Sequence, residues 1–331
     1  MQEVRNYPGA LAVEAIGLVK TFETVRAVDG IDLEVHQGQV LGVLGPNGAG
    51  KTTMLKMLAT LLPIDGGSAR IFGVDVATNP HQVRQLVGVT GQYASVDENL
   101  TGWENLVLFG RLLGLSRAEA RSTADELLTS FGLTAAAGRQ IKAFSGGMRR
   151  RLDLAASLIR RPPLIFLDEP TTGLDPRTRG QMWETIRALV RDGATVLLTT
   201  QYLDEADQLA DRIAVIDRGA KVAEGTPDEL KTSVGNSTLH VRLEDRERTV
   251  EAAALVARVM GEEPVLTPEA GGLNIALADA NRAADVLIAM REAKLAISTA
   301  SVRQPTLDEV FLALTGHHSD RDDAGAPGEV R

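Results

Sequence analysis

The sequence predicts an α/β protein whose main domain has a mostly parallel sheet, followed by a small α+β domain. Over residues 11–232, short apolar runs typical of buried strands alternate with helical segments, an order that favours a parallel sheet. Residues 11–35 alternate apolar and polar side chains with a turn near Asp29-Gly30, which predicts an antiparallel β-subdomain. Residues 237–316 follow the order strand, helix, strand, strand, helix, strand of a ferredoxin-like domain.

A glycine-rich loop follows the apolar run 40–44 and leads into a helix expected over 51–62. The loop fits the pattern G-x-x-x-x-G-K-[ST], in which backbone N–H groups and a helix N-terminus surround a phosphate. Lys51 would reach the β- and γ-phosphates of a nucleoside triphosphate, and the Thr52 hydroxyl would bind Mg²⁺. The strand before the loop and the amphipathic helix after it favour this site over a plain turn with a solvated lysine. Its residues are Gly45, Pro46, Asn47, Gly48, Ala49, Gly50, Lys51, Thr52 and Thr53.

Polar side chains also follow three other predicted strands. Asp168 and Glu169 end the apolar run 164–167, where the first acid can hold Mg²⁺ and the second can orient or deprotonate water. The alternative is a strand end capped by acidic residues, which the nearby phosphate loop disfavours. Gln92 and Gln201 follow strands as well. Gln92 either binds magnesium or caps a turn, whereas Gln201 either points at the γ-phosphate or caps the end of its strand. Because the carboxyl ends of parallel strands share one edge, we expect all four side chains to cluster.

A second helix start, near residue 145, resembles the first in its glycines. Ser145 is a good N-cap, and Gly146 and Gly147 leave backbone N–H groups uncovered in an anion-facing helix start. The two helix starts of a single subunit cannot easily contact the same nucleotide. Upstream, Phe22 either stacks on a nucleotide base or fills a strand core. A helix over 117–133 is expected to be broken by Gly138.

Length and composition restrict the class of protein. At 331 residues the chain is long enough for both domains, and a net charge of −9 argues against broad nucleic-acid binding. The sequence has no cysteine and no apolar run near the roughly 18 residues of a membrane span. The N-terminus lacks the pattern of a secretory signal. Residues 1–10 are expected to be a loose lead-in and 317–331 a disordered tail with solvated His317 and His318.

The order of these motifs resembles that of the ATP-binding-cassette (ABC) ATPases over roughly residues 10–230. Longer stretches are similar to the ATP-binding subunits of daunorubicin/doxorubicin resistance, over nearly the whole chain. The resemblance implies an ABC-type phosphate-loop NTPase fold with a helical subdomain at about 93–160. The matching segments are the phosphate loop at 45–53, TGQYASVDE, FSGGMRRRLD, LIFLDE, GLD, TTQYLDEADQLADRIAVID and LDEVFLALTG.

The same resemblance implies a homodimer in which two subunits pair head to tail around ATP. Ser145, Gly146 and Gly147 would hold the ATP on the partner's phosphate loop, and Asp175 would cross the interface. Phe22 would stack on adenine, Glu169 would be the catalytic base, and Gln92 would sense magnesium and a membrane partner. Two positions depart from the usual family pattern. Met148 replaces a glutamine, and Gln201 replaces the histidine that assists hydrolysis in most cassettes.

The resemblance implies an ATPase subunit of an exporter with ATP and Mg²⁺ as cofactors. It would energise efflux of a hydrophobic, drug-like antibiotic or a lipid through a separate multi-span permease. It would lie at the cytoplasmic face of the membrane as a peripheral protein. Two alternatives remain open at this point. One is a nucleotide-gated regulatory cassette with little hydrolysis, and the other is a soluble cassette protein without a transport role.

Overall fold

The computed structural model describes residues 10–91, 96–235, 237–267, 271–277, 279 and 281–316. Gln92, His317, His318 and most of the predicted lead-in lie outside the described residues. The chain divides into two compact units between Pro227 and Asp228. No described helix has both the length and the apolar character that a membrane crossing requires.

Among the described residues, a six-stranded sheet forms the centre of the first unit. Strands β3, β6, β7, β8 and β9 are parallel to one another, whereas the edge strand β10 pairs antiparallel with β9. The predicted, mostly parallel sheet is therefore confirmed. In order across the sheet the strands are β10 (Ala220–Gly225), β9 (Arg212–Asp217), β3 (Val40–Leu44), β8 (Thr195–Thr200), β7 (Leu164–Asp168) and β6 (Val87–Thr90).

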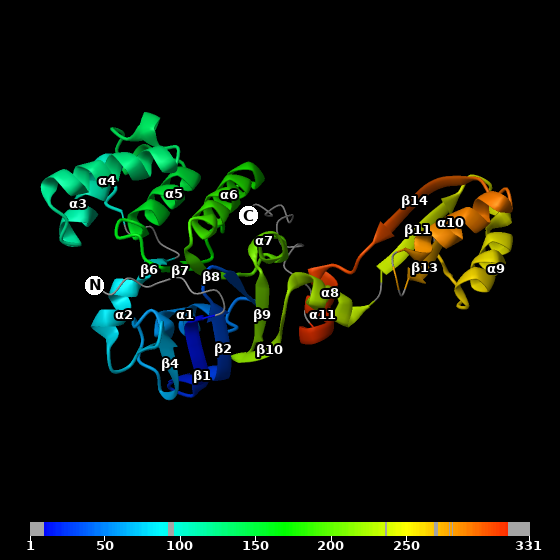
Figure 1. Cartoon of the computed structure of the whole chain (residues 1–331), viewed down its shortest axis with the longest axis horizontal. Coiled ribbons are helices and arrows are strands. Elements are labelled where there is room, and N and C mark those ends of the chain that lie inside the picture. Colours follow the sequence, from blue (N-terminus) through cyan, green and yellow to red (C-terminus); the bar gives the residue numbers. More distant parts are fainter. Residues whose placement is uncertain are drawn as a thin grey trace, which may run out of the picture. The chain divides into compact units, whose positions relative to one another are not determined.

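Both faces of this sheet are covered, which is why β3, β7 and β8 are buried along their whole length. Leu164 and Phe166 pack with α1 (Lys51–Leu58) and the antiparallel strands, whereas Ile165 and Leu167 pack with the helices of the opposite face. Figure 1 shows α3 to α6 above the central sheet and β1, β2 and β4 below it. The alternation along β7 thus joins two apolar cores through one strand.

The antiparallel β-subdomain has the strand order β2-β1-β4-β5. The chain reverses at Glu23, which has a φ of 50°, and the predicted turn at Asp29-Gly30 is wrong. Gly30 lies inside β2 with a φ of 70°, where the register with β1 shifts between two pairs, so its turn-like signal comes from a β-bulge. The strands are β1 (Leu11–Phe22), β2 (Val25–His36), β4 (Gly66–Ile71) and β5 (Val74–Asp75).

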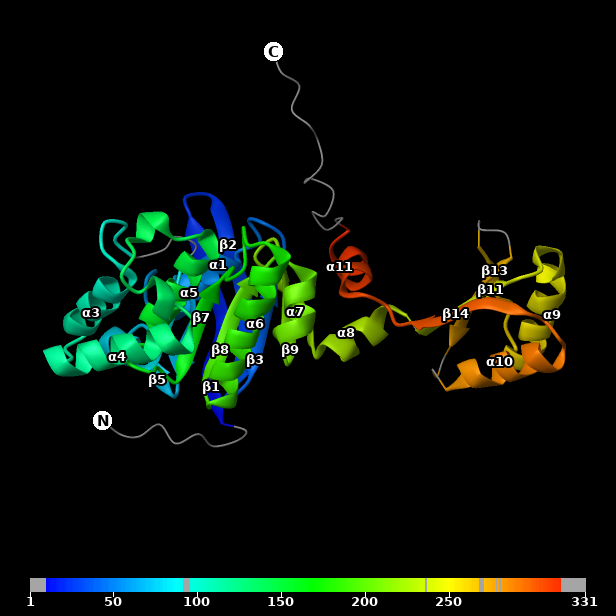
Figure 2. The same ribbon diagram turned by 90° about the horizontal axis from the view of Figure 1, so that it is seen from above.

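Helices α1 and α4 end where residues with a left-handed backbone follow them. Helix α1 ends at Leu58 rather than Leu62, two residues before Thr60 with its φ of 62°. Helix α4 ends at Ser130, before Gly132 with a φ of 63°, so Gly138 is not the residue that breaks it. Figure 2 shows α5 and α6 running over β7 and β8. The other helices are α2 (Pro80–Leu86), α3 (Gly102–Leu112), α4 (Arg117–Ser130), α5 (Gly146–Ser157), α6 (Pro176–Arg191) and α7 (Leu203–Leu209).

The second unit has the predicted ferredoxin-like topology. Its described strands form an antiparallel sheet in the order β12-β13-β11-β14, the second, third, first and fourth strands of that fold. Helices α9 and α10 pack on the sheet through an apolar core of their own. The elements are α8 (Pro227–Val234), β11 (Ser237–Leu243), α9 (Thr249–Met260), β12 (Val265–Leu266), β13 (Gly272–Leu277), α10 (Arg282–Glu292), β14 (Ile297–Arg303) and α11 (Leu307–Thr315).

Candidate nucleotide-binding site

The loop between β3 and α1 has a backbone that requires glycine at two positions. A Cβ added to Gly45 would lie 2.2 Å from the Ile216 carbonyl oxygen, and one added to Gly50 would lie 2.3 Å from that of Ala27. Gly50 also has a φ of 104°, which side chains with a Cβ rarely adopt. The close approach of neighbouring backbone therefore fixes the shape of the loop that the motif predicts.

Lys51 is held under this loop. Its Nζ donates hydrogen bonds to the carbonyl oxygens of Gly45 at 2.7 Å and Pro46 at 3.0 Å. It also lies 3.8 Å from Glu169 Oε1, and the Lys51 side chain is 4% exposed. Burial lowers the pKa of Lys51, an effect that the charges of Glu169 and Asp168 oppose. The site therefore presents a buried cation at the centre of a loop with the shape of a phosphate cradle.

A pocket of about 160 Å³ opens over the loop. The first turn of α1 forms one wall, and Glu169 enters from the end of β7. The loop and the helix start thus border one space with the N–H groups that a phosphate group requires, and the Glu169 carboxylate lies at the same space. The lining residues are Ala27, Asn47, Gly48, Ala49, Gly50, Lys51, Thr52, Thr53 and Glu169.

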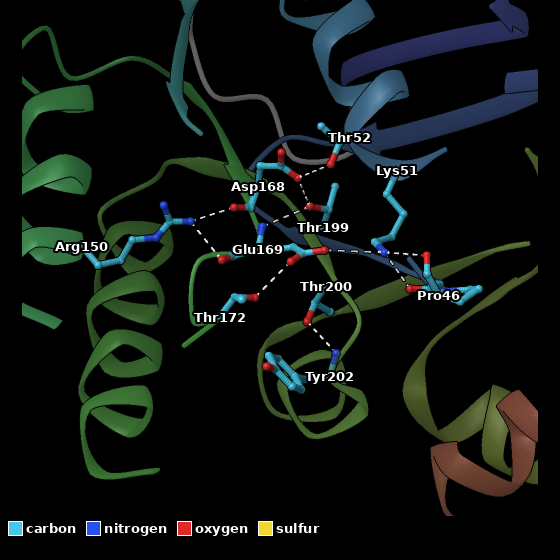
Figure 3. A network of polar contacts seen from close by, with 11 residues as sticks. Pro46, Lys51, Thr52, Arg150, Asp168, Glu169, Thr172, Thr199, Thr200 and Tyr202 are labelled. Atoms are coloured by element: carbon cyan, nitrogen blue, oxygen red, sulfur yellow. Dashed lines mark hydrogen bonds and ion pairs between the residues drawn. The ribbon is translucent and has the colours of Figure 1, made fainter. Parts of the chain in front are cut away.

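Asp168 joins the loop to the end of β7 (Figure 3). Its Oδ1 accepts hydrogen bonds from Thr52 Oγ1 at 2.9 Å and from Thr199 Oγ1 at 2.6 Å. Within the described ranges no three His, Cys, Asp or Glu side chains gather at one point. A hydroxyl beside one carboxylate nevertheless fits Mg²⁺, which typically takes one or two protein ligands and completes its shell with phosphate oxygens and water.

Glu169 has a left-handed backbone with a φ of 49°, and several hydrogen bonds hold it there. Its N–H donates to the carbonyl oxygen and to Oγ1 of Thr199, both at 3.1 Å. Its Oε2 accepts from Thr172 Oγ1 at 3.1 Å, and the residue is 7% exposed. A carboxylate fixed this firmly beside the pocket can orient a water molecule and accept its proton.

The second glycine-rich helix start does not line this pocket. Ser145 caps α5, because its Oγ accepts a hydrogen bond from the Met148 N–H at 3.3 Å. Asp175 caps α6 in the same way, accepting from the Thr178 N–H at 3.0 Å. A Cβ on Gly147 would lie 2.2 Å from Thr178 Cγ2, so the two helix starts pack together. Ser145, Gly146 and Asp175 are exposed in the single chain.

The remaining predicted residues lie at strand ends. Phe22 is the last residue of β1, is 43% exposed and lies under the Lys20 ammonium, which is 5.5 Å from the ring centre. It does not line the phosphate pocket. Gln201 directly follows β8, and its Oε1 is buried without a hydrogen-bond partner among the described residues. The site of Gln92 lies outside the described residues, directly after Gly91.

Three residues of the site were missed from the sequence. Thr199 donates to Asp168 and accepts from Glu169. Thr172 binds the Glu169 carboxylate, and Arg150 donates to backbone carbonyls around it. A hydroxyl within the apolar run 195–200 is a signal that could have identified Thr199. The run 149–151 gave no comparable signal, because consecutive arginines read as a charged surface patch.

Comparisons with known proteins agree with this geometry. The family model described as ABC transporter matches residues 28–172, which include the phosphate loop and both carboxylates. A second model, described as the C-terminal domain of ATP-binding proteins like DrrA1-3, matches residues 225–315. The two models therefore cover parts of both compact units.

Curated relatives extend over nearly the whole chain. The daunorubicin/doxorubicin resistance ATP-binding protein DrrA of Streptomyces peucetius is 55% identical over 93% of this chain and 94% of its own length. The linearmycin resistance ATP-binding protein LnrL of Bacillus subtilis is 34% identical over 92% and 98%. The Nod factor export ATP-binding protein I of Ralstonia nicotianae is 45% identical over 67% and 68%.

Solved structures match about two thirds of the chain. The dimeric, post-hydrolysis state of the ATP-binding cassette MJ0796, bound to ADP and Pi, has a TM-score of 0.60 at 26% identity, over 65% of this chain and 98% of that one. An ATP-binding subunit of an ABC transporter has a TM-score of 0.60 at 28% identity, over 67% and 92%. The chain therefore belongs to the ABC transporter family, as an ATP-binding and ATP-hydrolysing subunit related to the daunorubicin/doxorubicin-resistance proteins.

Proposed function

We propose that this chain hydrolyses ATP to drive efflux of a hydrophobic, drug-like antibiotic or a lipid through a separate multi-span permease. The observation that carries the proposal is the convergence of Lys51, Asp168 and Glu169 at one buried pocket. The cargo class is supported by relatives that are described as resistance proteins for daunorubicin, doxorubicin and linearmycin. We further propose that the chain works as a peripheral protein at the cytoplasmic face of the membrane, bound to that permease.

Each side chain of the site has a role in this proposal. The loop and Lys51 would bind the β- and γ-phosphates, while Thr52 and Asp168, with Gln92, would hold Mg²⁺. Bound Mg²⁺ would neutralise charge on the phosphate oxygens. Glu169 orients the attacking water and accepts its proton, because its carboxylate faces the pocket with its backbone fixed. Gln201 donates a hydrogen bond to the γ-phosphate through its amide, and Phe22 stacks on adenine.

The helix start of α5 has a role only in a pair of chains. Ser145, Gly146 and Gly147 stay outside the pocket of their own chain, as does Asp175. We therefore propose that two copies pair head to tail, so that each α5 start covers the ATP on the phosphate loop of the other. The dimeric state described for the cassette MJ0796 supports the pairing of two copies. Closing the site in this way would exclude bulk water from the γ-phosphate.

A second candidate is a regulatory cassette that binds ATP but turns it over slowly. Gln201 at the position of the histidine of most cassettes favours it, since a poorer hydrogen-bond donor at this position would slow hydrolysis. In either case we propose that residues 11–232 bind the nucleotide and that residues 237–316 serve pairing or permease docking.

Steady-state phosphate release by the complex purified from membranes tests the exporter proposal. We expect a multi-span protein to copurify and drug-like amphiphiles to stimulate turnover. The matched control is the same complex with Glu169→Gln, in which the stimulation should vanish. A complex that binds ATP and contains the spanning subunit, yet releases no phosphate with any compound, would favour the regulatory candidate. Phosphate release by protein that copurifies with no multi-span membrane protein would contradict the transport role.

A further inference from the structure

Three consecutive arginines of α5 make three different kinds of contact. Arg149 forms an ion pair with Glu98 at 2.7 Å, and that carboxylate is 63% exposed. Arg151 donates from Nη1 to the Phe131 carbonyl oxygen at 3.1 Å, within the helical part of the first unit. Arg150 instead extends to the ends of β6 and β7, next to the phosphate pocket (Figure 3). The charge run 149–151 is therefore not one surface patch.

The guanidinium of Arg150 serves four backbone carbonyl groups. Nη2 donates to Asp168 at 2.7 Å and to Glu169 at 3.0 Å, and Nε donates to Pro170 at 3.0 Å. Nη1 donates to the carbonyl oxygen of Gly91, directly after β6. The side chain is 12% exposed. A single buried side chain of α5 thus ties together the backbone that follows two neighbouring strands.

Glu169 needs this support because its backbone is left-handed, with a φ of 49°. Such a conformation in a residue with a Cβ persists where the surrounding contacts determine it. The Thr199 contacts hold the Glu169 N–H, while its carbonyl oxygen accepts from Arg150 at 3.0 Å and from the Thr172 N–H at 3.3 Å. Arg150 is the charged member of this set, and hydrogen bonds from charged donors are the stronger ones.

We infer that Arg150 is a positioning residue for ATP hydrolysis, which holds the backbone of 168–170 so that the Glu169 carboxylate keeps its place at the pocket. The inference rests on the proposed function, in which Glu169 is the catalytic base. It also gives α5 a second role in the same chain. In the proposed dimer, the first turn of α5 faces the nucleotide of the partner. Through Arg150 the same helix contacts the backbone of Glu169, the proposed base, and of Asp168, the proposed metal ligand, in its own chain.

The geometry requires arginine rather than lysine. The guanidinium has five N–H donors in a rigid plane, and here three nitrogens serve four acceptors. A lysine ammonium has three donors at one point and cannot span Gly91 and Pro170 together. Burial lowers the pKa of Arg150, and Asp153, with Oδ2 at 3.9 Å from Nη1, acts against this effect together with Asp168.

The test compares Arg150→Met and Arg150→Lys with Arg149→Met, which removes the neighbouring charge. ATP affinity by calorimetry and kcat and KM for ATP are measured for each. We expect both Arg150 variants to lose about 10–100-fold in kcat, the scale for residues that support a ligating or reacting group. Their KM and ATP dissociation constants should stay within about twofold, as should all constants of Arg149→Met.

Several outcomes would overturn the inference. Turnover within about twofold of wild type in Arg150→Lys would do so, as would a parallel loss of kcat and ATP affinity, which marks general structural support. If Arg150→Met fails to fold, the kcat of Arg150→Lys decides alone. Single-turnover hydrolysis in a Glu169→Gln background separates the two proposals. There, Arg150→Met should cost little more, whereas a Glu169→Gln protein as fast as wild type would remove the base assignment itself.

Discussion

Helices α1 and α5 both begin at glycine-rich segments, but the two helix starts have different surroundings. The start of α1 faces charged groups of its own chain, with Lys51 buried beneath the loop and Glu169 at the pocket. The start of α5 is capped by its own Ser145, and Gly146 beside it is exposed. In the proposed function, one chain therefore supplies a phosphate site together with its base, and separately offers a second helix start to the ATP of a partner.

A glycine-rich helix start is therefore not sufficient to form a phosphate site within one chain. At α1, neighbouring backbone at Ala27 and Ile216 forces the loop into its curve, and β7 brings the carboxylates. At α5, the close contact is between Gly147 and Thr178 of α6, so the glycine serves helix packing. The anion that α5 could bind must come from outside the chain.

Among changes at the site beside α1, replacing Glu169, the proposed base, should lower kcat the most. Glu169→Gln keeps the shape and the Thr172 contact but cannot accept a proton, so kcat should fall about 10²–10⁴-fold. ATP affinity by calorimetry should change little. Steady-state phosphate release measures the loss, and turnover near that of wild type would show that another group is the base.

Gln201 should have the next largest effect. Gln201→Ala removes an amide donor and should lower kcat about 10²–10³-fold, the scale for one donor to developing charge. Gln201→His should remain active and gain a titration near the ordinary imidazole pKa of about 6.5. The pH profiles of wild type and both variants provide the measurement. An alanine variant as fast as wild type would mean that Gln201 is a strand-end cap.

The third effect concerns binding rather than turnover. Lys51→Ala removes the buried cation that the Gly45 and Pro46 carbonyls hold. A charge-assisted contact is worth about 1.5–3 kcal/mol, so the ATP dissociation constant should rise about 10–150-fold. Titration calorimetry provides the check, with Lys56→Ala, on the exposed side of α1, as the control. Equal affinities of the two variants would remove the phosphate-loop assignment.

Removing the second unit should have the smallest effect on the site. Deletion of residues 236–331 leaves both helix starts and their apolar cores intact, since the cluster around Val241 and Ile275 belongs to the second unit alone. ATP affinity should stay within about twofold, while pairing or permease docking should weaken. A truncated protein that pairs and transports like the full chain would contradict the role given to that unit.

The sequence predicted what depends on local pattern. The motif at 45–53 could be recognised from the sequence, because the glycines that define its pattern are the residues that allow the loop to curve. The apolar run before Asp168 predicted a buried strand, and the strand and helix patterns along residues 237–316 predicted the ferredoxin-like order. These features each lie within one continuous segment.

Other features depend on contacts between distant segments. Gly30 has the signal of a turn, but the pairing of β1 with β2 makes it a bulge. Arg150 stands 18 and 59 residues from the carbonyls of Asp168 and Gly91, so its inward direction follows from the packing of α5 on the sheet. The left-handed backbone of Glu169 likewise depends on Thr199 in the neighbouring strand.

The proposed dimer requires that the α5 start of one chain closes the phosphate site of another. Gly146→Glu tests it, because a Cβ at Gly146 meets nothing within 4 Å and an acid in the first turn favours a helix. The monomer should therefore fold and bind ATP, but a carboxylate would oppose the partner's phosphates. Gly138→Glu is the matched control, at an exposed glycine with equally open space.

The measurement is size-exclusion chromatography of Glu169→Gln, alone and combined with each glycine substitution, in ATP and Mg²⁺. We expect an ATP-dependent dimer for Glu169→Gln and for its combination with Gly138→Glu, if the two chains pair as proposed. We expect monomer, with unchanged ATP affinity, for the combination with Gly146→Glu. Dimers in all three proteins, or monomers in all three, would contradict this pairing.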